Sequence, residues 1–324
     1  MENNNQQFLE PILHPKISLQ AALIIGAAVI SGSILYSAIL INNSLNNSMT
    51  RNISAETSNG GAQVSGGPAD EQIAALEEKV LPAQGVTLPV QWGDLGAQMI
   101  SAGIIDEQKF TELYASRGGL DEESKKLLSG NDNGYLVMTL ENSQILLNLL
   151  WAVGLGNKNV IMDGGPMSDK SNGGAGNFAS TGGWSLAAGD AMDHFSKHQL
   201  LILTAEQQSL VEDMAKNIYR PCCGNSTYFP DCNHGMAMLG LLELMASQGV
   251  SEVDMYKAAL AVNSYWFPDT YLTIAKFLDG KEIAWEAANP KSILAEEFSS
   301  AQGYQEVRSQ VEPVETKSSG GCGV

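Results

Sequence analysis

Residues 144–155 read QILLNLLWAVGL, a run that is apolar at almost every position. Apolar residues on all sides of a helix indicate that it is buried in the middle of a folded protein. The run is too short to cross a membrane as a helix, which takes about 20 residues. We therefore predict a buried central helix over residues 144–155.

On both sides of this run, apolar residues recur at spacings of three and four, the pattern of amphipathic helices. One such helix begins at a capping box, Thr204-Ala205-Glu206-Gln207, whose Thr and Gln side chains accept hydrogen bonds from each other's backbone N–H groups. Strand-like alternation is confined to residues 135–140. We predict a mainly α domain over residues 69–310, with further helices at about 70–81, 95–105, 106–115, 233–248, 251–266 and 268–279.

Glycine is concentrated in residues 157–184, where seven glycines stand among asparagines and serines. This composition predicts a long loop, and a long loop inside a folded domain is usually functional or disordered. The segment has neither the phosphate-binding pattern that ends in Gly-Lys-Ser/Thr nor Gly-x-Gly-x-x-Gly after a strand. We therefore expect no nucleotide site there.

Residues 17–41, ISLQAALIIGAAVISGSILYSAILI, contain no charged side chain and exceed the roughly 20 residues that a transmembrane helix needs. A cleaved signal peptide is the alternative, but it would have a cationic start and an Ala-x-Ala cleavage site. The leader carries Glu2 and Glu10 against the single Lys16, and no such site follows the run. The sequence predicts a retained transmembrane helix after an N-terminal tail, residues 1–16.

The segments outside the helical domain set its predicted location. Residues 42–68 are rich in Asn, Ser and Gly and predict a flexible stalk, and residues 311–324 predict a flexible C-terminal tail. Lys16 lies directly before the hydrophobic run, whereas the first charge after it is Arg51. This bias favours a cytoplasmic N-terminus. We predict a single-pass protein of the cell membrane with most of the chain outside the cytoplasm.

The composition excludes some partners and scaffolds. The chain carries a net charge of −18 and has no run of basic residues. Nucleic-acid binding needs clustered Lys and Arg, so nucleic acid is not an expected partner. Four cysteines in 324 residues are too few for a scaffold built on disulfides. The membrane is the partner that the sequence predicts.

Residues 220–236, RPCCGNSTYFPDCNHGM, hold three of the four cysteines and one of the four histidines. Pro221 ends one predicted helix, and Asp231 is in position to cap the next one. That cap would place Cys232 and His234 in or beside the first helical turn, where free backbone N–H groups favour a thiolate. This concentration of Cys and His predicts a functional site.

Two further histidines, His194 and His198, are four residues apart on a helix predicted from about Leu186. Residues at this spacing project from one face of a helix, and two histidines so placed can bind one metal ion. The Glu of the metalloprotease motif His-Glu-x-x-His is absent. The alternative interpretation is that both are ordinary surface residues of an amphipathic helix.

Thiolate and imidazole ligands together select zinc, copper or iron over magnesium and calcium. We predict a copper or zinc site, and the nearby Met236 and Met238 favour copper. The spacings match neither a Cys-x-x-Cys zinc knuckle nor a haem attachment motif. The predicted ligands are Cys222, Cys223, Cys232 and His234, with His194 and His198 as further ligands.

Two alternatives use the same cysteines without a metal. Outside the cytoplasm, Cys232 can form a disulfide with Cys222 or Cys223, which would make the region a structural or interaction domain. The cysteines can also exchange disulfides, with Cys322 on its glycine-rich tail as a mobile thiol. The sequence thus favours metal handling or redox chemistry and assigns no enzymatic reaction.

Overall fold

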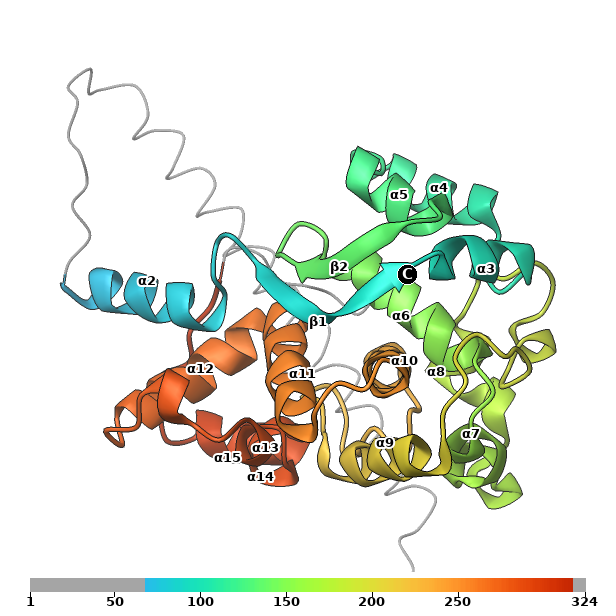
Figure 1. The fold of residues 1–324 in the computed structure, drawn as a ribbon. Helices are drawn as coiled ribbons and strands as arrows, with labels where there is room; N and C mark the ends of the chain where they lie inside the picture. The colour runs from blue at the N-terminus through green and yellow to red at the C-terminus, as the bar shows by residue number, and fades with distance from the viewer. Residues whose placement is uncertain (1–67, 317–324) are drawn as a thin grey trace, which may run out of the picture. The chain divides into compact units, whose positions relative to one another are not determined.

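The computed structural model describes residues 68–316, with side chains from Glu71 onward (Figure 1). The described residues are 57% helical, which confirms the mainly α prediction. None of the helices within residues 68–316 combines the length and the apolar character that crossing a bilayer requires. The predicted membrane helix, almost all of the predicted stalk, and Cys322 lie outside the described residues.

Two apolar helices cross at the centre of the domain, α6 (Ser143–Gly156) and α10 (Asn233–Ser247). The crossing needs glycine on both helices. A Cβ atom on Gly154 would lie 2.1 Å from the Met236 carbonyl oxygen, and one on Gly240 would lie 2.3 Å from the Leu150 carbonyl oxygen. The two backbones therefore touch, and α6 confirms the buried helix predicted over residues 144–155.

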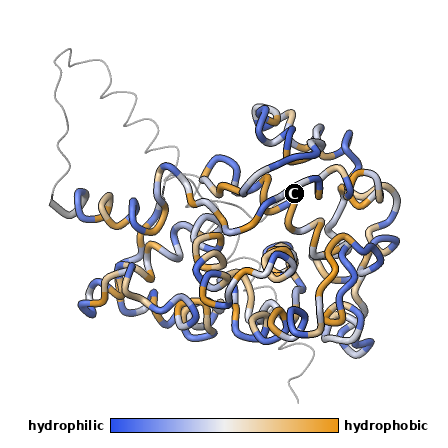
Figure 2. The backbone as a smooth tube through the Cα atoms, viewed as in Figure 1, coloured by the Kyte–Doolittle hydropathy of each residue, from blue (hydrophilic) through white to orange (hydrophobic). Residues whose placement is uncertain are grey.

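The other helices surround this pair and are mostly amphipathic. In Figure 2 the outer helices α4 and α5 change between blue and orange along their length, as half-buried surface helices do. The capping box at the start of α9 is formed as predicted. The helices are α2 (Pro68–Val80), α3 (Leu95–Ser101), α4 (Glu107–Ala115), α5 (Glu122–Ser129), α9 (Ala205–Asn217), α11 (Glu252–Trp266), α12 (Pro268–Asp279), α13 (Pro290–Ile293), α14 (Glu296–Ser299) and α15 (Ala301–Arg308).

A two-stranded antiparallel sheet pairs β1 (Val86–Gly93) with β2 (Asn133–Met138). Strand β2 confirms the alternation seen in the sequence. Strand β1 was not predicted, although its buried residues alternate at the strand period of two: Leu88, Val90 and Trp92. Pro89 lies between two of these buried residues, and the register is irregular between Thr87 and Gln91, because proline cannot donate to the ladder.

The glycine-rich segment is more structured than a plain loop. Residues 157–184 contain α7 (Val160–Gly164), α8 (Ala179–Gly182) and three short 3-10 turns. The helix predicted from Leu186 through His198 is wrong. Only a 3-10 turn, η4 (Ala191–Asp193), forms there, and Ser196 adopts a φ of 53°, a left-handed conformation that a continuing helix excludes.

Residues 311–316, part of the predicted tail, lie along α12. The backbone N–H of Val314 donates to Thr273 Oγ1 over 3.0 Å, and that of Thr316 donates to Asp269 Oδ1 over 2.7 Å. The described end of the chain is therefore tied to the C-terminal helices.

Candidate metal centre

The predicted cysteine cluster lies on the connection between α9 and α10, residues 218–232. The C-terminal helices hold this connection through its backbone. The Tyr219 N–H donates to the Leu294 carbonyl over 2.8 Å, and the Ala301 N–H donates to the Cys223 carbonyl over 2.9 Å. The Asn263 side chain, from α11, donates to the Tyr219 carbonyl over 3.0 Å. The loop that carries the cysteines is thus fixed from several sides.

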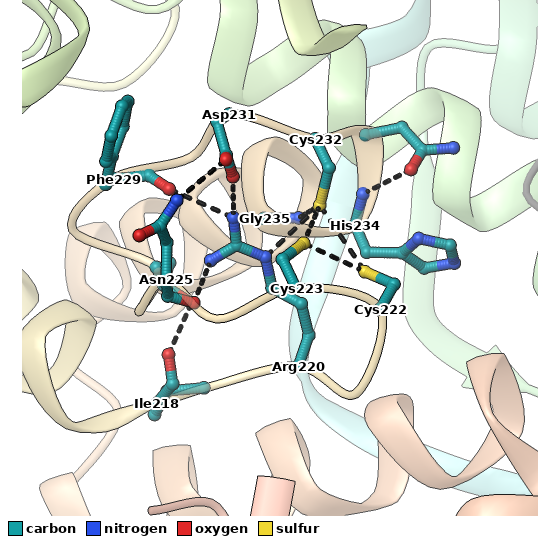
Figure 3. A network of polar contacts seen from close by, with 12 residues as sticks. Ile218, Arg220, Cys222, Cys223, Asn225, Phe229, Asp231, Cys232, His234 and Gly235 are labelled. Carbon is teal, nitrogen blue, oxygen red and sulfur yellow. Dashed lines mark hydrogen bonds and ion pairs between the residues drawn. The ribbon is translucent and has the colours of Figure 1, made fainter. Parts of the chain in front are cut away.

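Three sulfur atoms meet on this loop (Figure 3). The Sγ atoms of Cys222 and Cys223 are 3.2 Å apart, those of Cys223 and Cys232 are 3.2 Å apart, and those of Cys222 and Cys232 are 3.6 Å apart. A disulfide has a sulfur–sulfur distance of about 2.05 Å, so these are three free thiols in mutual contact. The structure brings together all three cysteines that the sequence predicts as ligands.

His234 is the one predicted histidine that lies beside the sulfurs. Its ring is buried between Trp266, with ring centroids 5.6 Å apart, and Phe267, with centroids 4.4 Å apart. A ligand atom of His234 and the sulfurs of Cys222 and Cys232 all lie within 4.8 Å of one another. These residues are therefore close enough to hold one metal ion, and Cys223, Asp231 and Cys232 form a second group that is equally close.

His194 and His198 are paired with each other instead. His194 Nδ1 lies 3.0 Å from His198 Nε2, and His194 Nε2 lies 3.0 Å from the Ala188 carbonyl oxygen. Because a carbonyl only accepts, His194 Nε2 carries the proton, and its Nδ1 accepts from His198. Both ring nitrogens of His194 are thus occupied. Among residues 68–316, neither histidine belongs to a group of three or more His, Cys, Asp or Glu residues whose ligand atoms lie within 4.8 Å of one another.

The start of α10 differs from the prediction in one residue. Cys232, not Asp231, is the N-cap, and its sulfur accepts a hydrogen bond from the Gly235 N–H over 3.4 Å. The Asp231 carboxylate instead bonds to the side chains of Arg220 and Asn225, the latter over 2.7 Å. In the first turn of α10 the Gly235 N–H therefore points at the Cys232 sulfur, as predicted. The difference is that the capping residue is Cys232 and not Asp231.

Arg220 is the functional residue that the sequence analysis missed. Only 1% of its side chain is exposed. Its Nε donates to Cys232 Sγ over 3.2 Å, and its other nitrogens donate to the carbonyls of Asn225, over 2.7 Å, and Phe229, over 3.0 Å, and to Asp231. A Cβ atom on Gly235 would lie 2.6 Å from the guanidinium carbon. Arg220 therefore packs against Gly235, which leaves room for the guanidinium. The sequence alone does not show this contact, because it forms only when the loop folds.

The three thiols differ in acidity. The pKa of Cys232 is lowered well below its usual value, because it accepts hydrogen bonds from Cys222 and Cys223, and His234 and the Arg220 cation add to this effect. The pKa of Cys222 is raised by its hydrogen bonds to the other two sulfurs and by burial. For Cys223, the contact with Cys222 lowers the pKa, but the contact with Cys232 and burial raise it, to about 12 overall. Cys232 is therefore the thiol that ionises most readily.

A second buried acid lies further along α10. Glu243 is fully buried and accepts hydrogen bonds from the side-chain amides of Asn157, over 3.2 Å, and Asn159. Burial raises its pKa to about 8. The sequence signal was a single charge inside the apolar run LGLLELMA, residues 239–246.

The ligand atoms of the cluster limit which metal ions it can bind. Three cysteines and one histidine are the ligands of Cys3His zinc sites, and soft thiolates also bind copper(I). A four-iron cluster attaches each thiolate to a different iron atom, so sulfurs in mutual contact favour a single ion. Met236 and Met238 are buried in the hydrophobic core.

Comparison of the chain with family models, curated proteins and solved structures found no match.

Proposed function

We propose that this protein is a membrane-anchored, extracytoplasmic protein that binds one zinc or copper ion through Cys222, Cys223, Cys232 and His234. Its role would be metal handling or redox chemistry. The observation that carries the proposal is the convergence of three thiol sulfurs, 3.2–3.6 Å apart, beside a buried imidazole.

The sulfur triangle is small enough for one ion to contact all three sulfurs from one side. Because its sides measure 3.2, 3.2 and 3.6 Å, a point about 2.3 Å from all three sulfurs, the usual zinc–thiolate bond length, lies about 1.2 Å from their plane. Cys222 is exposed, so an ion can enter from the solvent. Binding would release the protons of Cys222 and Cys223, since thiolates are the ligand form.

Metal analysis of the full-length protein, purified under reducing conditions, tests this proposal. We expect about one zinc or copper ion per chain, as a single closed site requires. Replacing His234 by alanine should weaken binding by at least the roughly 10–100-fold that loss of an outer-shell partner costs. His198→Ala is the matched control, because His198 lies outside the cluster. A folded wild-type protein that neither contains nor takes up metal would contradict the proposal.

Thiol–disulfide exchange is the second candidate function. It is favoured by a thiolate-forming Cys232 in contact with two thiols, one of them, Cys222, exposed. A Cys223–Cys232 disulfide would form by exchange with a disulfide of another molecule, which is reduced to two thiols, while these sulfurs move from 3.2 Å to about 2.05 Å. Mass mapping of the protein from its native compartment separates the two functions. A metal-bound protein should show free thiols at all three positions, whereas an exchange protein should show a mixture of disulfides.

The membrane anchor rests on residues 17–41 and their lack of charge. If the anchor is retained with the N-terminus inside, protease added to intact cells should release a fragment that begins within residues 42–68. N-terminal sequencing of the released fragment identifies the cleavage site. Protection of the chain in intact cells, with cleavage only after lysis, would contradict the proposed orientation. Recovery of the uncleaved chain from the soluble fraction would contradict the anchor itself.

A further inference from the structure

We propose that Arg220 is the counter-ion of the metal centre and sets how well the site accepts ions of different charge. The inference rests on the proposed metal-binding function. Its basis is the buried guanidinium, whose Nε lies 3.2 Å from Cys232 Sγ, inside the loop that gathers the three sulfurs. Its bond to Cys232 puts a full positive charge directly against one of the three sulfurs.

The charge count explains why a cation is buried there. Three thiolates and one divalent ion leave a net charge of one negative unit, which the guanidinium offsets before the Asp231 carboxylate is counted. With a monovalent ion such as copper(I), the same groups carry one more negative charge. Burial of unpaired charge costs free energy. The charge balance therefore favours a divalent ion such as zinc over copper(I) at this site.

Asp231 is the opposing charge at the same guanidinium. Its carboxylate pairs with Arg220 and also accepts a hydrogen bond from Asn225, over 2.7 Å. Its side chain is 22% exposed, whereas that of Arg220 is 1% exposed. Water therefore screens the carboxylate more than the guanidinium. Asp231 therefore offsets part, but not all, of the positive charge that Arg220 presents to the sulfurs.

Affinities of the full-length protein for zinc(II) alone and for copper(I) alone, each measured by competition with a chelator, test the inference. Arg220→Met should lower zinc affinity by about 10–100-fold, as loss of an outer-shell partner does. Copper(I) affinity should fall by about tenfold more than that, because the copper centre carries one more negative charge beside the missing cation. Arg220→Lys retains the charge and should reduce this difference between the ions. The exposed Arg308→Met is the matched control and should change neither affinity.

A purely structural role for Arg220 would lower both affinities equally, and that result would overturn the inference, as would a lysine variant that restores nothing. Asp231→Asn supplies a second test, which keeps the Arg220 cation in place but removes the carboxylate that pairs with it. It removes a negative charge, so it should shift the balance in the opposite direction, raising copper(I) affinity relative to zinc by about two- to fivefold. No shift in this variant would also overturn the inference. A wild-type protein that binds neither ion would instead refute the metal site itself.

Discussion

Replacement of Cys232 by serine should leave the protein folded and remove its metal ion. Cys232 is in contact with both other sulfurs and accepts hydrogen bonds from Arg220 and from the Gly235 N–H. Serine is a good N-cap and can accept the same two bonds, so α10 should still form. It cannot supply the thiolate on which a soft ion depends.

The measurement is the metal content of wild-type and variant protein, with circular dichroism to follow helix content. Cys322→Ser is the control, because Cys322 is the one cysteine outside the proposed ligand set. We expect about one ion per chain in the wild type and in the control, and less than about a tenth of that in Cys232→Ser, given the cost of losing a ligand. Wild-type metal content in Cys232→Ser would refute the ligand assignment.

The second large effect concerns Glu243 and the dependence of stability on pH. Burial raises its pKa from 4.5 in the unfolded chain to about 8 in the folded protein. Between these values the folded state binds more protons than the unfolded state, so this group makes the free energy of unfolding decrease as the pH rises. The slope approaches about 1.4 kcal/mol per pH unit. Its contribution is largest below pH 4.5 and is lost as the pH passes 8.

Glu243→Gln should remove this slope, because an amide does not titrate. The comparison is best made in the Cys232→Ser background, where metal binding does not add its own pH dependence. Urea unfolding of the two proteins from about pH 5 to 8 gives the difference in unfolding free energy, which should increase steadily in favour of glutamine. A constant difference across this range would mean that the carboxyl titrates normally, and hence that it is not buried in solution.

Local signals in the sequence predicted much of the helical fold. The apolar run at residues 144–155, the capping box at Thr204 and the cysteine-rich motif each carry their information within a few neighbouring residues. The structure confirms the helix and the capping box, and it brings the three cysteines of the motif together. The strand β1 escaped prediction because a proline within a run argues against a strand, and because its paired residues in β2 lie 40–52 positions away in the chain.

The rest of the site depends on tertiary structure. The spacing of His194 and His198 suggested a shared helix face, but the left-handed Ser196 between them breaks the helix and turns the two rings toward each other. Arg220 is an ordinary residue before Pro221 in the sequence. Its role appears only when the loop closes and Gly235 leaves room for the guanidinium. No local pattern encodes that contact.

X-ray absorption spectroscopy at the zinc and copper edges tests the central claim most directly, because it reports the ligand atoms of the bound ion. For the full-length protein we predict three sulfur ligands at about 2.3 Å and one nitrogen ligand at about 2.0 Å, the distances of a Cys3His zinc centre. The His234→Ala variant should lose the nitrogen ligand and keep the sulfurs. A spectrum with only nitrogen and oxygen ligands, or a metal-free protein with Cys232 in a disulfide, would contradict the account.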